Sequence, residues 1–299
     1  MRDGRLEKTG HLAVFRADGG PKSGMGHIVR CVALAQAMDV PTVFLSCPDE
    51  AVEALVRRAG FEYSAMEEPG CWPLHVARLQ PSVVVVDNYA ISGSEVALVK
   101  EAVPLLVVVD DLNDRNLPAD LVINGNITAR HLGYAQDKVL LLGPEYALLG
   151  APFRGMPPKG IPEVASNVLI TTGGGDPFRV TLAVLQCLLD MNLHIKVACG
   201  PQFGAKADLD SLIRNRSSVA AVDLLDNPDM ATMMLWADLA VSTGGSTLYE
   251  LCAAGVPALA MAVAENQVAS AQMLGNRGYM IYLGRFADVC GDGGRSGGR

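Results

Sequence analysis

Short runs of β-branched and aliphatic residues alternate with segments of helical length from end to end of the chain, and this alternation restricts the fold more than any other feature. It is typical of parallel α/β layers. The first half predicts a helix at 27–38, and its strand-like runs cover residues 11–15, 42–46, 82–87 and 105–110. Two of these runs are apolar and end in an acid, Asp87 and Asp110, as expected of buried parallel strands whose carboxyl ends open onto a cleft.

Residues 150–162, GAPFRGMPPKGIP, are rich in glycine and proline and show no periodicity, which predicts an interdomain linker. The alternation then resumes, with strands expected at 167–171, 194–198 and 239–242 and helices at 178–190 and 246–254. We therefore predict two facing Rossmann-like domains, at residues 1–152 and 163–285, with the active site in the cleft between them. Residues 286–299 are low in complexity and are expected to be a disordered or truncated tail.

The composition favours a globular protein that handles a small molecule. Half of the 299 residues are hydrophobic, and the formal net charge is −8. A negative surface repels nucleic acid, so any phosphate site must be local and built from backbone donors. No apolar run approaches the roughly eighteen residues that span a bilayer, and the charged N-terminus lacks the apolar core of a secretory signal. We expect a cytoplasmic monomer with a small-molecule substrate, no nucleic acid partner and no insertion into a membrane.

The sequence offers no pattern for a metal or a redox cofactor. Its seven cysteines are scattered, with no C-x-x-C pair and no Cys/His cluster at the spacing of metal ligands, which predicts reduced, mostly buried thiols. No glycine-rich loop continues into the Gly-Lys-Ser/Thr of an ATP-binding loop, and the first loop is not a full G-x-G-x-x-G. We therefore expect neither a cofactor nor a bound metal.

Three glycine-rich loops, at 24–27, 173–176 and 244–247, stand where a strand-like run is followed by a helix. Glycine allows a close approach of the backbone, and the first amides of a helix are unpaired donors at the positive end of its dipole, so a diphosphate would be stabilised there. One such loop alone is as often only a tight turn, but three in equivalent places favour a phosphate ligand. The candidate binding residues are Gly26, Gly173, Gly174, Gly244, Gly245, Ser246 and Thr247.

Two side chains beside these loops are candidates for specific roles. Glu250 follows Thr247 by three residues, so it lies on the same helix face and can accept hydrogen bonds from both hydroxyls of a ribose. The alternative is a capping or solvated glutamate. His27 starts a helix, where the dipole keeps its ring neutral and able to accept a proton from water. The alternative is a histidine that only hydrogen-bonds a neighbouring loop.

Taken as an ordered set, the motifs resemble a known family. They are Arg16-Ala17-Asp18, Gly24-x-Gly26-His27-x-x-Arg30-Cys31, Asp87-Asn88-Tyr89, Asp110-Asp111 with Asp114-Arg115, Gly143 to Leu149, Gly173 to Pro177, Ala237-Asp238-Leu239, Gly244-Gly245-Ser246-Thr247-x-x-Glu250, and Ala264-Glu265-Asn266-Gln267. Over residues 11 to 283 the chain resembles the UDP-sugar hydrolases of pseudaminic acid biosynthesis, which include spore-coat polysaccharide proteins.

The resemblance implies a GT-B fold and metal-independent hydrolysis of UDP-2,4-diacetamido-2,4,6-trideoxy-β-L-altropyranose to the free sugar and UDP, with inversion at the anomeric carbon. It implies that His27 assists the attacking water and that Tyr89 lies near the reacting sugar, with Asp87 and Tyr89 next in line as the base. The C-terminal loop and Glu250 would bind UDP. Arg16 and Asp18 would contact the substrate, and the diphosphate or sugar would be reached by Glu265 and Asn266.

Two departures from the family stand out. Relatives continue beyond the strand at 280–283, often into a helix that crosses back to the first domain, where this chain has Gly/Arg-rich sequence. Relatives also carry an arginine near position 150, where this chain reads Leu149-Gly150-Ala151-Pro152-Phe153. We have no physical account of this difference.

Three other functions compete with hydrolysis. A GT-B glycosyltransferase would use the same UDP site and pass the sugar to an acceptor other than water; the C-terminal motifs are shared in looser form with the enzyme that completes lipid II. The sequence shows no obvious apolar or basic patch for a lipid carrier. A non-catalytic nucleotide-sugar binding protein would bind UDP without turnover. A hydrolysing epimerase is less favoured because its paired acids are not evident.

Overall fold

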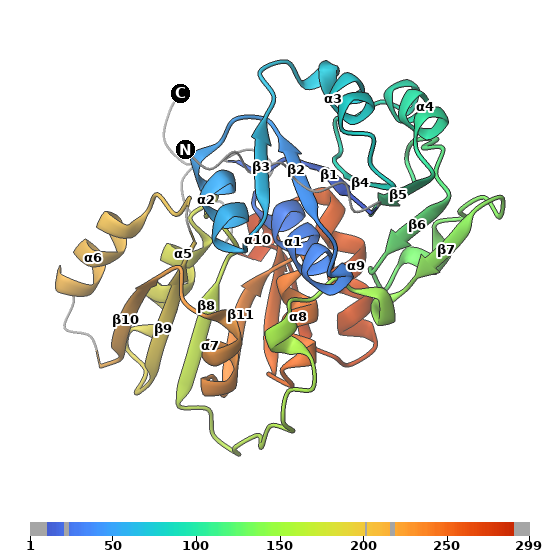
Figure 1. The fold of residues 1–299 in the computed structure, drawn as a ribbon. Coiled ribbons are helices and arrows are strands. Elements are labelled where there is room, and N and C mark those ends of the chain that lie inside the picture. The colour runs from blue at the N-terminus through green and yellow to red at the C-terminus, as the bar shows by residue number, and fades with distance from the viewer. Residues whose placement is uncertain (1–10, 21–23, 201, 216–218, 290–299) are drawn as a thin grey trace, which may run out of the picture. The chain divides into compact units, whose positions relative to one another are not determined.

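The computed structural model describes residues 11–20, 24–200, 202–215 and 219–289, which fall into two compact units, Met1–Gly150 and Ala151–Arg299. Each unit is a parallel β-sheet flanked by helices (Figure 1). Among the described residues, no helix is long and apolar enough to cross a membrane. The first unit ends at the start of the glycine- and proline-rich segment that predicts the linker.

The described residues of the first unit form a seven-stranded sheet in the order β3-β2-β1-β4-β5-β6-β7. Its strands are β1 Ala13–Ala17, β2 Thr42–Ser46, β3 Glu62–Ala65, β4 Val83–Asp87, β5 Leu105–Val109, β6 Leu121–Asn124 and β7 Val139–Leu142. Every pairing is parallel. The chain runs outward from β1 to β3 and then returns to the other side of β1, so β1 and β4 flank the switch point where ligands bind in open α/β sheets.

Helices cover both faces of this sheet, and β1 is accordingly buried along its whole length. On one face Phe15 packs with residues of α1 and α2, such as Ile28 and Val52. On the other face Val14 packs with residues of α3 and α4, such as Trp72. The helices are α1 Gly26–Met38, α2 Glu50–Arg58, α3 Trp72–Leu79 and α4 Gly93–Ala102, with short 3₁₀ turns η1 Pro69–Cys71, η2 Ala129–His131 and η3 Pro144–Tyr146.

The second unit repeats the plan with a six-stranded parallel sheet in the order β10-β9-β8-β11-β12-β13. Its strands are β8 Asn167–Thr171, β9 His194–Cys199, β10 Ala221–Asp226, β11 Leu239–Thr243, β12 Ala258–Ala262 and β13 Ile281–Arg285. Its helices are α5 Val180–Leu188, α6 Lys206–Asn215, α7 Met230–Trp236, α8 Thr247–Ala253, α9 Glu265–Asn276 and α10 Phe286–Val289, after a 3₁₀ turn η4 Ala151–Phe153. Here β8 and β11 flank the switch point.

The α/β fold predicted from the alternation is confirmed, and the departures are local. The first strand begins two residues later than expected, at Ala13, because its ladder to β2 and β4 starts there, and it therefore includes Arg16. Part of the expected tail, 286–289, forms helix α10, and its remaining residues, 290–299, lie outside the described part. The expectation of mostly buried thiols is wrong: of the six cysteines described, only Cys31 and Cys199 are buried.

A close backbone approach ties the end of the first unit to its sheet. A Cβ on Gly125, the residue after β6, would lie 2.6 Å from the Cα of Ala147. The Gly143 amide also donates to the Asn124 carbonyl at 2.9 Å. Only glycine permits this contact, so the chain that runs toward Gly150 packs directly against the loop after β6.

Candidate active site

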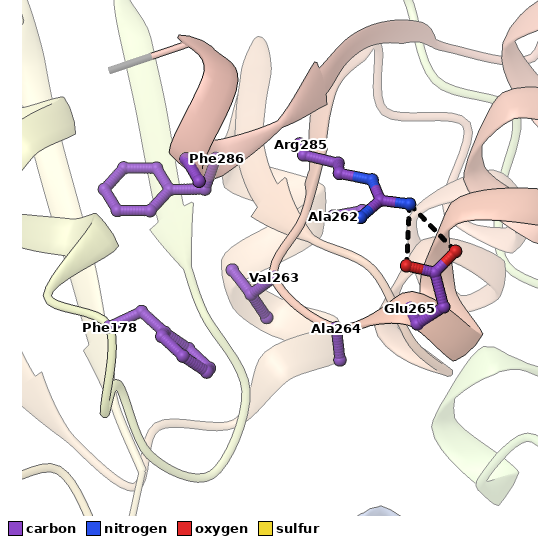
Figure 2. Close-up of a pocket in the computed structure, with 8 residues that line it drawn as sticks. Phe178, Ala262, Val263, Ala264, Glu265, Arg285 and Phe286 are labelled. Atoms are coloured by element: carbon purple, nitrogen blue, oxygen red, sulfur yellow. Dashed lines mark hydrogen bonds and ion pairs between the residues drawn. The ribbon is translucent and has the colours of Figure 1, made fainter. Parts of the chain in front are cut away.

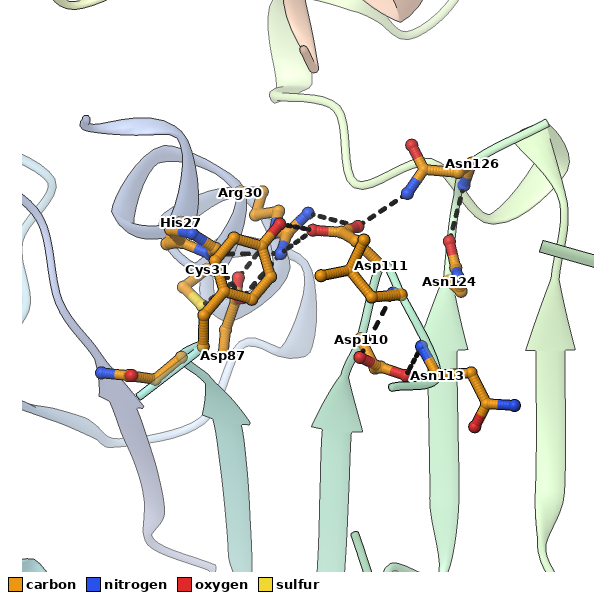
Figure 3. A network of polar contacts seen from close by, with 12 residues as sticks. His27, Arg30, Cys31, Asp87, Asp110, Asp111, Asn113, Asn124 and Asn126 are labelled. Carbon is orange, nitrogen blue, oxygen red and sulfur yellow. Dashed lines mark hydrogen bonds and ion pairs between the residues drawn. The ribbon is translucent and has the colours of Figure 1, made fainter. Parts of the chain in front are cut away.

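The carboxyl ends of β1, β4, β5 and β6 in the first unit carry the polar residues that the sequence analysis singled out. His27, the second residue of α1, points its Nδ1 at the Asp87 carboxylate, and the two atoms are 2.7 Å apart. Asp87 is the last residue of β4 and is fully buried. The pair therefore sits at the switch point of the sheet, joining the helix after β1 to the end of β4 (Figure 3).

Arg30 lies one helical turn after His27 and joins two carboxylates. Its Nε and Nη2 donate to Asp87 at 2.5 and 2.6 Å, and its Nη1 and Nη2 donate to Asp111 at 2.9 and 2.8 Å. Both contacts are bidentate, the strongest arrangement available to a guanidinium and a carboxylate. Its Nη2 also lies 3.2 Å from His27 Nδ1. Arg30 thus connects the end of β4 to the loop after β5.

Tyr89 completes the cluster, which we call the His27 cluster: His27, Arg30, Asp87, Tyr89 and Asp111. The Tyr89 hydroxyl donates to Asp111 at 2.5 Å. Its ring meets the His27 ring edge to face, with the centroids 4.6 Å apart and the planes at 86°. Tyr89 is 39% exposed and His27 is 8% exposed. Tyr89 is therefore the accessible side chain of the cluster, and the charged groups lie beneath it.

The charge states of the cluster follow from its contacts. Burial acts to raise the pKa of Asp87, but Arg30 and His27 hold it well below the ordinary value. Burial likewise opposes ionisation of Asp111, and Arg30 again holds its pKa below the ordinary value. Burial and the Asp111 charge raise the pKa of Tyr89 well above its usual range. At neutral pH both carboxylates are ionised and Tyr89 is a neutral phenol.

This arrangement separates the three residues that the sequence analysis named as possible bases. Asp87 binds His27, Arg30 and, at 3.5 Å, the Cys31 thiol, so it has no access to a substrate. Tyr89 keeps its proton. A carboxylate at Nδ1 fixes the proton of a neutral imidazole on that nitrogen and leaves Nε2 as the acceptor. In the described structure Nε2 of His27 has no hydrogen-bond partner, which makes His27 the base best fitted to water or a hydroxyl.

A second polar network supports the loops after β5 and β6. The Asp110 carboxylate accepts the Asn113 amide at 2.9 Å and the Tyr134 hydroxyl at 2.7 Å. Tyr134 in turn accepts from the Asn124 side chain at 3.0 Å. Asn126, in the loop after β6, donates to Asp111 at 2.7 Å. The loop that holds Asp111 is thus fixed from the neighbouring strand, as Figure 3 shows.

Arg16 and Asp18, expected to bind substrate, serve mainly to hold the loops together. Arg16 is 1% exposed, so its guanidinium is out of reach of a ligand; it pairs with Asp18 at 2.7 Å. Asp18 also accepts the Cys47 amide at 2.7 Å and the Asn88 side chain at 2.6 Å. Arg16 therefore positions the residues after β1, β2 and β4, and the contacts of Arg16 and Asp18 with a substrate stay a prediction. Gly26 is exposed at the start of α1, beside His27.

In the second unit, the Gly173 loop precedes a helix whose first amides already have an acceptor, and the phosphate contacts expected of Gly173 and Gly174 stay a prediction. The Asp176 carboxylate accepts the amides of Val180 and Thr181 at 2.9 and 2.8 Å, so it occupies the N-terminus of α5 where a phosphate would bind. The backbone of Gly174 lies against Gly200, where a Cβ would be 2.5 Å from the Gly174 carbonyl oxygen, so position 200 requires glycine. Gly173 has a positive φ of 87° and open space around it.

The Gly244 loop, between β11 and α8, is the stronger candidate for a ligand. Gly244 packs against α9, where a Cβ would lie 2.6 Å from Cβ of Gln267, and Gly245 faces open space with a φ of 126°. Ser246 and Thr247 follow at the start of α8 and are partly exposed. Glu250 lies one turn further, partly buried, and no described residue hydrogen-bonds its carboxylate. Burial raises the pKa of Glu250 to about 7.

Glu265 and Asn266 begin α9, and both are exposed. Glu265 pairs with Arg285 at 2.6 Å, at the rim of an apolar pocket of about 190 Å³. Figure 2 shows the phenyl rings of Phe178 and Phe286 on the wall of this pocket, with Val263 between them. The pair lies at the carboxyl ends of β12 and β13. The carboxylate of Glu265 is thus already paired with the guanidinium of Arg285. The expected contacts of Glu265 and Asn266 with a diphosphate or a sugar stay a prediction.

Sequence reasoning missed Arg30, Asp111 and Asn126 as site residues. Signals for the first two were present: Arg30 follows His27 by three residues on one helix face, and Asp111 follows a buried strand. Asn126 carried no such signal, because its place beside Asp111 depends on the pairing of β5 with β6.

Comparison with known proteins gives distant relatives. No protein-family model matches the chain. The spore coat polysaccharide biosynthesis protein SpsG of Bacillus subtilis is 25% identical over 289 residues, covering 92% of this chain and 84% of that protein. An uncharacterized protein of Methanocaldococcus jannaschii is 26% identical over 261 residues, covering 82% of this chain and 54% of that protein. The chain therefore spans about half the length of the archaeal relative.

The fold matches those of glycosyltransferases. MurG of Acinetobacter baumannii superposes with a TM-score of 0.62 at 16% identity, over 91% of this chain and 85% of that one. HepE of Anabaena, solved in complex with UDP and glucose, gives a TM-score of 0.54 at 12% identity, over 84% of this chain and 80% of that one. The chain therefore has the two-domain GT-B fold, and it is similar in sequence to a polysaccharide biosynthesis protein.

Proposed function

We propose that the protein hydrolyses a UDP-linked diacetamido-trideoxy sugar to the free sugar and UDP, in the biosynthesis of a nonulosonic acid such as pseudaminic acid or of a surface polysaccharide. The observation that carries this proposal is the His27–Asp87 contact of 2.7 Å at the switch point of the first sheet. It gives a histidine whose Nδ1 is held and whose Nε2 is available as a general base.

In this reaction Nε2 of His27 takes a proton from water while the water oxygen forms a bond to the anomeric carbon. The bond between that carbon and the diphosphate oxygen breaks, its electron pair leaves with UDP, and the carbon inverts. Tyr89, the exposed member of the His27 cluster, lies against the imidazole ring and orients the water or the sugar. The histidine returns its proton to solvent after product release.

The second unit supplies nucleotide binding in this proposal. Glu250 accepts hydrogen bonds from the ribose hydroxyls, which supplies the partners that its carboxylate lacks among the described residues. The Gly244–Thr247 loop meets the diphosphate with backbone amides, which carry the charge of the leaving group without a metal ion. Glu265 and Asn266 contact the diphosphate or the sugar from the start of α9.

The comparisons support the proposal at a coarser level. The sequence similarity to SpsG supports a role in polysaccharide biosynthesis, and the fold shared with HepE, a UDP complex, supports a UDP-sugar ligand. Neither relative defines the sugar.

The test is turnover of a panel of UDP-2,4-diacetamido sugars in water, followed by UDP release and by the configuration of the product. We expect UDP and free sugar of inverted anomeric configuration in equal amounts. UDP binding without release from any member of the panel would instead support the non-catalytic alternative.

A glycosyltransferase is the second candidate, because the fold matches are glycosyltransferases and a histidine base activates a sugar hydroxyl as readily as water. The two functions separate in one experiment. Hydrolysis proceeds in buffer alone, whereas a transferase releases UDP only when an acceptor is added, and its product is the acceptor glycoside.

A further inference from the structure

The guanidinium of Arg30 is the only link that the described structure shows between the supports of His27 and those of Tyr89. On one side it donates to Asp87, which holds His27 at Nδ1. On the other it donates to Asp111, which accepts the Tyr89 hydroxyl. Its side chain is only 16% exposed, and the two carboxylates are 0% and 14% exposed, so solvent screens these charges weakly.

The charges on this bridge do not cancel. Two ionised carboxylates and one guanidinium leave a net charge of −1 beside the His27 ring. The groups that face the ring are Asp87 from β4, Arg30 from its own helix and Tyr89 from the loop after β4, with Asp111 behind Arg30 and the Cys31 thiol against Asp87. Tyr89 and Cys31 stay neutral, because burial raises the pKa of both groups.

We infer that Arg30 and Asp111 are positioning residues that set the pH at which His27 takes up a proton and hold Tyr89 against its ring. The chemistry follows from the sum of charges. Removing the guanidinium leaves two carboxylates near the imidazole and favours its protonated form, whereas removing the Asp111 charge disfavours that form. The two residues therefore act on His27 in opposite directions, which packing alone does not do.

The inference concerns the residues that support the proposed base, and it is tested first without a substrate. The titration of His27 is followed by NMR of its ring protons, and the His27→Asn variant identifies its signal among those of the five histidines. Arg30→Gln should raise the midpoint of this titration by about one pH unit, and Asp111→Asn should lower it by a similar amount. Asp137→Asn is the matched control, because it removes one exposed carboxylate that pairs with Lys138; it should leave the midpoint unchanged.

Arg30→Lys separates charge from geometry. It keeps the positive charge but loses the two bidentate contacts, so the midpoint should stay close to that of the wild type while the order of Tyr89 is lost. If Arg30→Gln does not fold, the isosteric Asp111→Asn still decides. An Asp111→Asn midpoint that stays in place or moves upward overturns the inference.

A kinetic measurement then joins the inference to the proposed function. The acid limb of the kcat/KM profile should move with the NMR midpoint in Asp111→Asn, and Arg30→Lys should lower kcat with UDP affinity retained. If the wild-type protein shows no turnover, the proposed function fails, but the NMR result still decides the role of Arg30 and Asp111. If the acid limb of the kcat/KM profile stays in place in Asp111→Asn while the NMR midpoint of His27 moves, His27 is not the base.

Discussion

At the scale of single residues, the site is defined by which polar groups have a partner and which do not. Asp87 has its oxygens filled by His27, Arg30 and Cys31, and Asp111 by Arg30, Tyr89 and Asn126. Nε2 of His27 and the Glu250 carboxylate have no hydrogen-bond partner among the described residues. Buried or half-buried polar groups are normally satisfied, so a ligand can add a hydrogen bond at both positions. The buried Nε of Arg16 also lacks a hydrogen-bond partner among the described residues.

His27→Asn should retain UDP binding and lose most turnover. Asparagine keeps a hydrogen-bonding group near Asp87 but cannot take up a proton at neutral pH, and a positioned general base contributes about 10²- to 10⁴-fold in rate. UDP affinity by calorimetry and kcat by UDP release are the two measurements. A variant with near wild-type turnover would exclude His27 as the base, and loss of UDP binding would make it a structural residue.

Glu250→Gln should weaken UDP binding in a pH-dependent way. The ribose hydroxyls favour the ionised carboxylate, and burial raises the pKa of Glu250 to about 7, so the carboxylate becomes the better acceptor as the pH rises through 7. At pH 8 the variant should lose about 1.5–3 kcal/mol of binding free energy, and less at pH 6.

Calorimetry gives the UDP affinities of the wild-type protein and of Glu250→Gln between pH 6 and pH 8. We compare the ratio of the two affinities at each pH, because titration of the UDP phosphate affects both proteins equally and cancels in the ratio. The control is Asp223→Asn, which removes a carboxylate of the second unit that pairs with His194. If the ratio of the two affinities does not change with pH, the charge of Glu250 does not contribute to UDP binding.

At the scale of elements, the sequence predicted the strands better than the contacts between them. Two strands, β2 and β8, have the predicted bounds, because continuous apolar runs bounded by polar residues leave little freedom. Strand ends carrying Asp87 and Asp110 pointed to the carboxyl edge of the sheet. The Arg30 bridge was not predictable in the same way, because it joins residues 57 and 81 positions apart that meet only once β4 and β5 pair.

The N-terminus of helix α5 is capped by a carboxylate of the chain itself, that of Asp176. Asp176→Ala should destabilise the protein by about 0.5–2 kcal/mol, because the amides of Val180 and Thr181 lose their acceptor. Urea unfolding measures this change. Asp208→Ala, which removes an exposed carboxylate paired with Arg179, should cost no more than about 1 kcal/mol. Equal effects from both variants would mean that Asp176 does not cap the helix.

At the scale of the whole molecule, each unit brings a different kind of residue to its switch point. The first unit gathers titratable side chains after β1, β4 and β5, and the second gathers glycines and one carboxylate after β11. The two Rossmann-like units follow from the sequence because the alternation of strands and helices occurs twice, whereas the GT-B fold was implied by the family resemblance. The expected active site between the two domains stays a prediction, as do the monomeric state and the cytoplasmic location.

Turnover should survive chelation, because the proposal assigns the charge of the leaving group to backbone amides of the second unit. We expect kcat in the presence of EDTA to equal kcat in untreated protein, and added magnesium or manganese to change it little. Loss of turnover on chelation with recovery on adding either ion would contradict the assignment and require a cation at the diphosphate.

The close approach of Gly125 and Ala147 makes the geometry around His27 depend on the last residues of the first unit. A Cβ on Gly125 would lie 2.6 Å from the Cα of Ala147, so the backbone of residues 143–149 leaves no room for a side chain at this point of the loop after β6. The next residue, Asn126, donates to Asp111 at 2.7 Å, and Asp111 binds Arg30. An insertion or a bulky substitution at this point would therefore disturb Asp111 and, through Arg30, the surroundings of His27, although the altered residue lies far from both in the sequence.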